Sequence, residues 1–109
     1  MKKILFICLF GRDRSARAVE IIKEEFSNDE FEAKCAGVSE IADTPLTEQA
    51  IEWTEKIVCM EREHRDALFQ RFPEARSKEV VVWNIPNYFS FGNEGLGEEL
   101  RGKIKIIKK

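Results

Sequence analysis

The sequence predicts one α/β domain, residues 1–109, in which helices cover both faces of a four-stranded parallel sheet. Three observations support this prediction. Segments with strand-like and helical hydrophobic spacing alternate four times, which is typical of parallel strands joined by right-handed crossover helices. Residues 3–8 are continuously apolar, as expected for a strand that is buried on both faces of a sheet. The 109 residues suffice for one hydrophobic core and leave no room for a second domain.

The predicted strands are short runs of apolar or alternating residues bounded by turn-forming residues. They cover residues 3–8, 31–35, 56–60 and 79–83, and Gly37 ends the second of them. Ligands of parallel α/β sheets bind beyond the carboxyl ends of the strands. We therefore expect Cys8, which ends the first strand, and the segment after the fourth strand to lie on the same rim.

Each predicted strand is followed by a predicted helix. Residues 14–26 carry apolar side chains at helical spacing with charged residues on the opposite face. Helix-start signals at Thr44, Pro45 and Thr47 precede a second helix, which continues to about Trp53. The third helix covers residues 61–72 and stops at Pro73. Residues 84–97, rich in glycine, proline and asparagine, are predicted to form a loop, and the last helix covers residues 98–107.

Composition excludes several classes of function. The formal net charge of −2 gives no reason to expect binding to nucleic acid or to a membrane surface. The three cysteines are widely spaced and odd in number, so they indicate neither a disulfide framework nor a zinc site. The apolar run after Lys3 is too short for a signal peptide, and no segment has the length of a membrane span. We therefore expect a cytoplasmic protein with reduced thiols.

One motif indicates chemistry: Cys8, five further residues, then Arg14 and Ser15, between a predicted strand and a predicted helix. This spacing is typical of a cysteine-based phosphate site. The intervening backbone N–H groups can turn inward around a tetrahedral oxyanion, and Arg14 supplies a planar fork of donors. The positive end of the following helix points to the same place. Cys8 would lie beneath the anion as a thiolate nucleophile. The alternative is that Cys8 is simply a small core residue at the end of an apolar strand.

With this motif the sequence resembles the low-molecular-weight protein tyrosine phosphatases, and in particular a short variant of about this length. The resemblance covers most of the chain, although only the cysteine loop is highly specific. It rests on Ile4-Leu5-Phe6-Ile7-Cys8, Arg14-Ser15, Ala36-Gly37, Thr44-Pro45-Leu46-Thr47, Val58-Cys59-Met60-Glu61 and Asn84-Ile85-Pro86-Asn87-Tyr88. It implies a flavodoxin-like three-layer α/β/α sandwich. It also implies hydrolysis of phosphotyrosine or similar aryl phosphate monoesters without a metal or cofactor.

The resemblance also implies roles for individual residues. Cys8 would form a phosphocysteine, Arg14 and the backbone N–H groups of residues 9–14 would hold the equatorial oxygens, and Ser15 would donate a hydrogen bond to the Cys8 sulfur. The expected partners are a phosphorylated protein or a small aryl phosphate, with inorganic phosphate or sulfate in the loop. The residues expected to contact substrate are Leu9, Phe10, Gly11, Arg12, Asp13, Asn84, Asn87 and Tyr88, and further loop aromatics at Phe89 and Phe91 are candidates for a wall of the site.

The sequence departs from the pattern of that family at several positions. Gly11 stands where the family has an asparagine that supports the loop, and Asp13 stands where longer members have a second cysteine. The family takes its general acid, an Asp, from the loop after the last strand, where the candidates here are the amides Asn84 and Asn87. General acids typically contribute about 10²–10⁴-fold to rate, so we expect slow hydrolysis. Asp13, Asp43 and Glu94 are the candidate substitutes.

Two other functions remain open at this point. The first is a binding module, in which an intact phosphate cradle recognises a phosphorylated protein without turnover. The second is an arsenate reductase, which requires a relay of further cysteines, and neither Cys35 nor Cys59 lies in the loop where such enzymes carry them. The single histidine, His64, is predicted to have a structural role at the surface or half-buried, because a thiolate in a cationic loop needs no histidine base.

Overall fold

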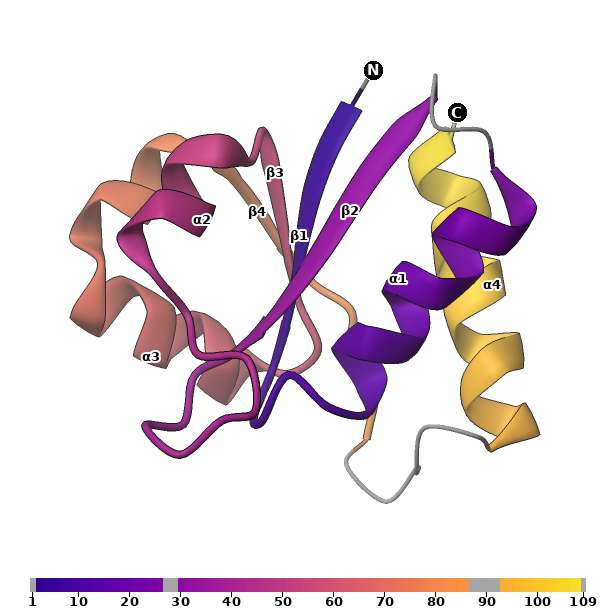
Figure 1. The fold of residues 1–109 in the computed structure, drawn as a ribbon, viewed down its shortest axis with the longest axis horizontal. Coiled ribbons are helices and arrows are strands. Elements are labelled where there is room, and N and C mark those ends of the chain that lie inside the picture. Colours follow the sequence, from indigo (N-terminus) through magenta and orange to yellow (C-terminus); the bar gives the residue numbers. More distant parts are fainter. Residues whose placement is uncertain (1, 27–29, 87–92, 109) are drawn as a thin grey trace.

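A computed structural model describes residues 2–26, 30–86 and 93–108 (Figure 1). At its centre is a four-stranded sheet in the order β2-β1-β3-β4, in which every pair of neighbours is parallel. The strands are β1 (Lys2–Cys8), β2 (Phe31–Gly37), β3 (Lys56–Cys59) and β4 (Glu79–Val82). The predicted parallel α/β architecture is confirmed.

Helices cover both faces of this sheet. The helices α1 (Arg14–Glu25) and α4 (Glu94–Lys108) lie side by side on one face, and α2 (Glu48–Trp53) and α3 (Arg62–Arg71) lie on the other (Figure 1). The predicted three-layer, flavodoxin-like sandwich is therefore confirmed. A short 3₁₀ helix, η1 (Pro73–Ser77), follows α3 and was not expected from the sequence.

The strand β1 is buried from both sides because it runs through the middle of the sheet. Its residues Ile4, Leu5, Phe6 and Ile7 are each 0% exposed. Alternation along the strand sends Ile4 and Phe6 into the core under α1 and α4, and Leu5 and Ile7 into the core under α2 and α3. Fully burying each of these side chains stabilises the fold by about 1.5–3 kcal/mol, and this anchors the strand that ends in Cys8.

The carboxyl ends of the strands meet at one rim, because all four strands run in the same direction. Cys8 pairs with Gly37 of β2, while Ile7 pairs with Cys59 of β3. Beyond the strands, the Met60 N–H donates to the Ile7 carbonyl at 2.9 Å and the Ile85 N–H donates to the Met60 carbonyl at 2.8 Å. The segments that follow the strands are thereby fixed around the end of β1, on the rim that the sequence predicts.

The start of α4 differs from its prediction. The helix begins at Glu94, whereas residues 94–97 were expected in a loop because of their glycines. The Asn93 side chain accepts a hydrogen bond from the Leu96 N–H at 3.2 Å, which is a favourable helix N-cap contact. Leu96, Leu100 and Ile104 form a fully buried stripe. The other boundaries shift by one or two residues.

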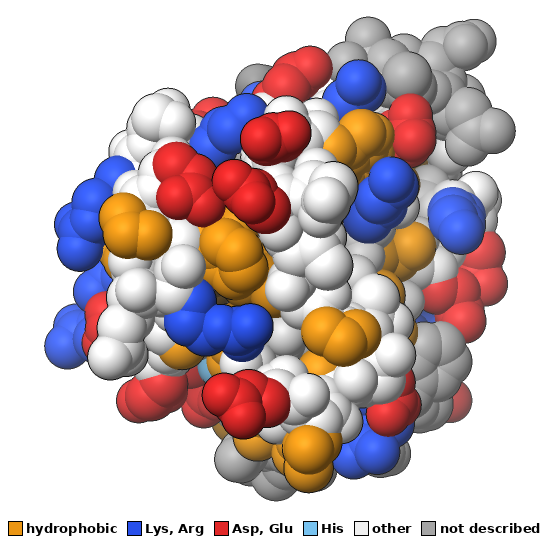
Figure 2. Space-filling view, turned by 60° about the vertical axis from the view of Figure 1, so that its left-hand side comes forward, with side chains coloured by type: hydrophobic (Ala, Val, Ile, Leu, Met, Phe, Trp, Pro, Cys, Tyr) orange, Lys and Arg blue, Asp and Glu red, His pale blue; other side chains and the backbone are white. Residues whose placement is uncertain are grey.

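Figure 2 shows acidic and basic side chains interspersed on the face of the molecule that carries α2 and α3. Within residues 2–26, 30–86 and 93–108, no helix is long and apolar enough to cross a membrane.

Candidate active site

The loop of residues 9–13 connects β1 directly to α1 and places three polar side chains in the protein interior. Cys8, the last residue of β1, is 2% exposed, and Arg14 and Ser15, the first residues of α1, are 4% and 0% exposed. A buried charge and a buried hydroxyl are stable only with partners. The structure therefore brings together the three residues predicted to carry the chemistry.

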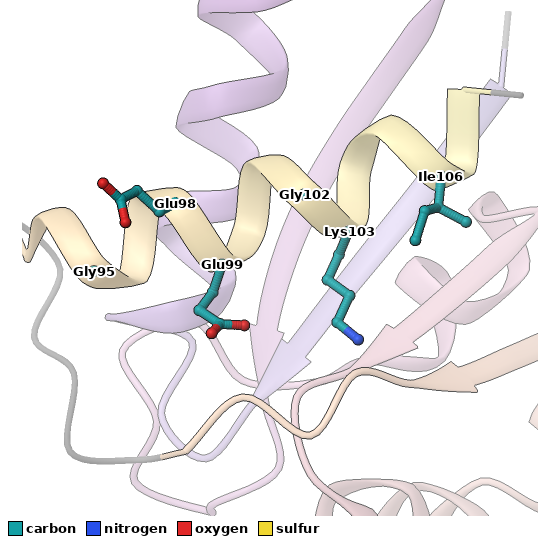
Figure 3. Close-up of a pocket in the computed structure, with 6 residues that line it drawn as sticks. All are labelled: Gly95, Glu98, Glu99, Gly102, Lys103 and Ile106. Carbon is teal, nitrogen blue, oxygen red and sulfur yellow. The ribbon is translucent and has the colours of Figure 1, made fainter.

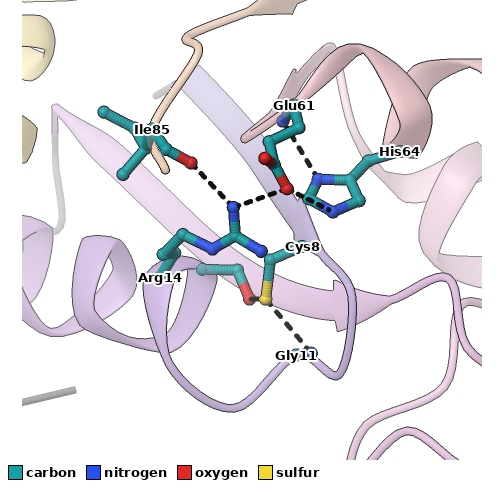
Figure 4. A network of polar contacts seen from close by, with 7 residues as sticks. Cys8, Gly11, Arg14, Glu61, His64 and Ile85 are labelled. Carbon is teal, nitrogen blue, oxygen red and sulfur yellow. Dashed lines mark hydrogen bonds and ion pairs between the residues drawn. The ribbon is translucent and has the colours of Figure 1, made fainter. Parts of the chain in front are cut away.

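The Cys8 sulfur has two polar neighbours from this segment. The Ser15 Oγ lies 3.0 Å from the Cys8 Sγ, and the backbone N–H of Gly11 donates to the same sulfur at 3.2 Å (Figure 4). Both are contacts that a negatively charged sulfur accepts more strongly than a neutral thiol does. The arrangement is suited to a thiolate, and an N–H group of the loop is turned inward.

The carbonyl groups of the same loop point away from the Cys8 sulfur. Those of Cys8, Leu9 and Phe10 accept hydrogen bonds from the neighbouring loop after β2. The donors are the N–H groups of Val38, Ser39 and Asp43, at 3.0, 2.9 and 3.0 Å. Since three successive carbonyls are used on the outside, the negative ends of these peptide dipoles are held away from the site.

Two glycines make this contact between the loops possible. Gly11 has a φ of +66°, a left-handed conformation that favours glycine, and a Cβ on it would lie 2.9 Å from the Ala36 carbonyl carbon. A Cβ on Gly37 would lie 2.4 Å from the Phe10 carbonyl carbon. Asparagine also tolerates a positive φ, so Gly11 and the asparagine expected from the family resemblance share a backbone preference.

The Arg14 guanidinium is fixed by contacts that the sequence did not predict. Its Nη1 donates to the Ile85 carbonyl at 2.7 Å and lies 3.0 Å from the Glu61 Oε2 (Figure 4). Ile85 belongs to the segment after β4, and Glu61 precedes α3. Both contacts use Nη1, so neither of them engages Nη2, the other terminal nitrogen of the guanidinium. The guanidinium is therefore oriented by groups on two elements remote in sequence.

His64 contacts Glu61 and holds it in place. The prediction that this histidine lies at the surface or half-buried is wrong, because the side chain is buried. It is 3% exposed. Its Nδ1 accepts a hydrogen bond from the Glu61 N–H at 3.0 Å, and its Nε2 lies 3.5 Å from the Glu61 Oε2. Burial, and secondarily the charge of Arg14, lowers the pKa of His64 to about 4. The ring is neutral at neutral pH, and these contacts assign its proton to Nε2.

Glu61 and His64 are thus site residues that sequence reasoning did not identify as such. One signal was available: Glu61 comes two residues after the end of the buried strand β3, at the rim where Cys8 also ends a strand. Their spacing of three residues at the start of a helix is also that of reciprocal helix capping. The contact with Arg14 had no local signal.

The remaining predicted contact residues line the exposed side of the loop or lie outside the described residues. Leu9 is 41% exposed, and the Arg12 side chain is 55% exposed. Arg12 lies over the Phe10 ring at 4.9 Å from its centroid, and its Nε is 3.9 Å from the Asp43 Oδ2. The half-buried Asp13 precedes the first turn of α1. Asn87, Tyr88, Phe89 and Phe91 are outside the described residues.

The candidate proton donors occupy different places around the rim. Asn84 is exposed, with a φ of 56°. Asp43 is 56% exposed and faces Arg12, and Glu94 is the exposed first residue of α4. The Asp13 side chain makes no hydrogen bond to the start of α1. The prediction that one of these carboxylates replaces the missing acid stays a prediction.

The other two cysteines differ in kind from Cys8. The Cys35 thiol donates to the Gly11 carbonyl at 3.7 Å, and burial, followed by the nearby Cys8, raises its pKa. Burial raises the pKa of Cys59 to about 12. All three thiols are free. Because a relay of thiols requires thiolates, these environments do not favour the arsenate-reductase alternative.

A groove of about 470 Å³ runs along α4, lined by Gly95, Glu98, Glu99, Gly102, Lys103 and Ile106 (Figure 3). Its lining carries the carboxylates of Glu98 and Glu99 and one ammonium group, that of Lys103, so it offers an anion no net positive charge. Among the described residues, no group of three or more His, Cys, Asp or Glu side chains is placed to hold a metal ion.

No family model matches the sequence, and no curated protein matches it. Solved structures do share its fold. A mutant of YwlE from Bacillus subtilis aligns over 100% of both chains with a TM-score of 0.74 and 21% identity. The tyrosine phosphatase Wzb from Escherichia coli K30, solved in complex with phosphate, has a TM-score of 0.76 and 19% identity over 98% of this chain and 96% of its own. SP-PTP, a low molecular weight protein tyrosine phosphatase from Streptococcus pyogenes, has a TM-score of 0.74 and 18% identity, over 97% of this chain and 87% of its own. The resemblance drawn from the sequence is thus matched in three dimensions, and the chain has the fold of the low-molecular-weight protein tyrosine phosphatases.

Proposed function

We propose that this protein is a cysteine-dependent phosphatase that hydrolyses phosphotyrosine or a similar aryl phosphate monoester. The observation that carries the proposal is the surroundings of one sulfur. The Cys8 Sγ accepts a hydrogen bond from the Gly11 N–H at 3.2 Å and lies 3.0 Å from the Ser15 Oγ, and the loop leads directly to the buried Arg14 at the start of α1. A nucleophile, an inward N–H group and a fixed guanidinium are elements that transfer of a phosphoryl group uses.

The reaction has two steps. The Cys8 thiolate attacks phosphorus, an S–P bond forms, and the P–O bond to the aryl group breaks as a proton reaches the leaving oxygen. Water then attacks the phosphorus, the S–P bond breaks, and inorganic phosphate leaves as the thiolate is restored. Arg14 and the loop N–H groups hold the equatorial oxygens in both steps. A hydrogen bond from Ser15 lowers the basicity of the sulfur and so improves it as the leaving group of the second step.

Solved structures with a similar fold support this choice of chemistry. Wzb was solved with phosphate, and a YwlE arginine phosphatase was solved with a phosphorylated active-site serine. The second of these is named an arginine phosphatase, so the fold by itself does not select the substrate. We favour the aryl phosphate because Wzb and SP-PTP, which share the fold, are named tyrosine phosphatases.

The missing acid sets the expected rate. With amides at Asn84 and Asn87, the leaving oxygen departs without an efficient donor, and rates depend steeply on the pKa of the leaving group. Nitrophenyl phosphate is then hydrolysed much faster than a phosphotyrosine peptide. A phosphate-binding module without turnover is the competing function, and it predicts no hydrolysis of either compound.

The test uses two variants of the full chain. Cys8→Ser abolishes nitrophenyl phosphate hydrolysis while inorganic phosphate still binds, because a hydroxyl has far too high a pKa to replace the thiolate. Arg14→Ala weakens phosphate binding, measured by titration calorimetry, by about 2 kcal/mol, as expected for the loss of one member of a charged pair. Acid quenching of the parent during turnover yields a phosphorylated peptide that contains Cys8. Activity retained in Cys8→Ser, or unchanged phosphate affinity in Arg14→Ala, contradicts the proposal.

A further inference from the structure

Two arginines near Cys8 lie in opposite environments: Arg12 in the loop of residues 9–13, and Arg14 at the start of α1. The Arg14 side chain is 5% exposed and held by Glu61, whereas the Arg12 side chain is 55% exposed. Only Arg14 is built into the interior as a fixed group of the cradle. Arg12 stands on the exposed side of the same loop, where its charge is available to a molecule that approaches the site.

Arg12 is nevertheless held in place. Its guanidinium carbon lies 4.9 Å from the centroid of the Phe10 ring, within the range of a cation–π contact. Its Nε lies 3.9 Å from the Asp43 Oδ2, and the Asp43 N–H donates to the Phe10 carbonyl at 3.0 Å. The aromatic ring and the carboxylate that guide Arg12 are thus both attached to the loop itself. A guanidinium whose orientation is restricted before binding loses less entropy when it binds.

The contact between Arg12 and Asp43 leaves room for a competing anion. At 3.9 Å, with both side chains more than half exposed, the pair lies at the outer limit of an ion pair and is screened by water. A carboxylate that meets the guanidinium fork with two short hydrogen bonds binds it better than Asp43 does. Three carboxylates oppose an incoming anion and lower its affinity: Asp13, which follows Arg12 in the chain, Asp43, which faces Arg12, and the exposed Glu40 in the same loop as Asp43.

The surroundings of Arg12 suit a peptide. Leu9 in the loop is 41% exposed, and Ile41 in the adjoining loop after β2 is 81% exposed. These apolar groups offer contact surface to the residues that flank a phosphorylated side chain.

We propose that Arg12 is a specificity-determining residue that selects phosphopeptides with an acidic residue next to the phosphorylated tyrosine. This inference rests on the proposed function, since the phosphoryl group must occupy the cradle formed by Cys8 and Arg14. The carboxylate of the flanking residue pairs with the Arg12 guanidinium over the Phe10 ring and displaces Asp43 from it. The preference is electrostatic, so it decreases as salt screens exposed charges.

The experiment compares two phosphotyrosine peptides that differ only by Glu or Gln beside the phosphotyrosine. The ratio of their kcat/KM values is measured for each form of the protein, so that any general effect of a substitution cancels. In the parent we expect a preference of about fivefold for the Glu peptide, through KM, as is typical of a partly exposed charged pair. Arg12→Gln brings the ratio close to one, and Asp43→Asn raises it because a competitor is removed. The parent ratio decreases toward one at about 1 M salt, where the Debye length is about 3 Å.

A matched control is available in η1, which precedes β4 and so lies at the end of the sheet opposite the loop of residues 9–13. Arg76 in η1 is also exposed and also lies over an aromatic ring, at 4.5 Å from the Phe69 centroid. Arg76→Gln removes the same charge at a position outside the loop and leaves the ratio at its parent value. An equal loss in both variants shows that overall charge, and not Arg12, sets the preference, and this overturns the inference.

The same ratio is measured as Kd with the Cys8→Ser variant and fluorescently labelled peptides, so that it is obtained even without turnover. A Kd ratio near one in that variant overturns the role of Arg12. Clear turnover of nitrophenyl phosphate by the parent together with a ratio near one disproves the inference and leaves the phosphatase proposal intact. A clear Kd ratio without any turnover supports the role of Arg12 and disproves the proposed hydrolysis.

Discussion

The Glu61 carboxylate lies 3.0 Å from the Nη1 of Arg14 and joins the start of α3 to the start of α1 directly beside the Cys8 loop. The Arg14 side chain is 5% exposed and that of Glu61 is 29% exposed. A buried guanidinium without a carboxylate partner is costly. The pair therefore sets both the direction of the fork and part of the stability of the loop.

Replacing Glu61 by glutamine tests this relationship. Glu61→Gln keeps the shape of the side chain and removes its charge, so the free energy of unfolding decreases by about 2 kcal/mol because Arg14 loses its counter-charge. Inorganic phosphate supplies that charge when it binds, so it raises the Tm of the variant more than that of the parent. Thermal unfolding with and without phosphate measures both effects. The control is Glu63→Gln, an exposed carboxylate in the same turn, and equal behaviour of the two variants contradicts the role of Glu61.

Replacing Gly11 by alanine is expected to destabilise the loop for geometric reasons. In Gly11→Ala, the new Cβ at φ +66° would lie 2.9 Å from two backbone atoms, the Ala36 carbonyl carbon and the Gly37 nitrogen. We expect a loss of about 1–3 kcal/mol of stability and weaker phosphate binding, since the loop must move away from the segment after β2.

Gly102→Ala is the matched control. It lies in α4 with open space around its Cβ, and it stabilises the helix by about 0.5–1 kcal/mol. Urea unfolding distinguishes the two, and a neutral Gly11→Ala would contradict this geometry.

His64 gives the protein a specific dependence of stability on pH. Its pKa is about 4 in the folded protein against an ordinary value of 6.5, so the unfolded chain binds the proton first as pH falls. The contribution of His64 to stability is complete above about pH 6.5, decreases between pH 6.5 and 4, and levels off below about pH 4. The full loss is up to roughly 3 kcal/mol, from 1.36 kcal/mol for each pKa unit.

Comparison with His64→Gln separates this effect from the titration of carboxylates, which both proteins share. We expect the difference in free energy of unfolding between parent and variant to shrink as pH falls from 7 to 4. Urea unfolding at several pH values measures it. A difference that stays constant over that range would show that the ring is not held neutral by burial.

Restoring a carboxylate after β4 tests whether the missing acid limits hydrolysis. Asn84→Asp raises turnover of a phosphotyrosine peptide by at least about tenfold, and that of nitrophenyl phosphate less, because poor leaving groups gain most from protonation. Asn87→Asp is the companion variant for the second candidate position. Asn93→Asp adds a carboxylate at the start of α4 and serves as control. A parent that is already fast on phosphotyrosine, with a flat dependence on leaving-group pKa, would show that another group donates the proton.

The sequence alone determined the layer architecture and the central motif. The short, continuously apolar run of residues 3–8 is typical of an interior strand, and the alternation that follows implied a parallel sheet. The spacing from Cys8 to Arg14 and Ser15 then placed a thiol, a guanidinium and a hydroxyl on one short loop. These are local properties, written in neighbouring residues, and they are readable without long-range information.

Only the tertiary structure decided how that loop is held. Arg14 is oriented by Glu61 and by the Ile85 carbonyl, which come from the ends of two other strands, and no local pattern encodes such contacts. The start of α4 shows the same limit, because the glycines at 95 and 97 favour a loop locally. Packing reverses this preference, because burying Leu96 in the core gains more free energy than a helical glycine costs. Burial and long-range contacts thus override local propensity at the points where the candidate site is completed.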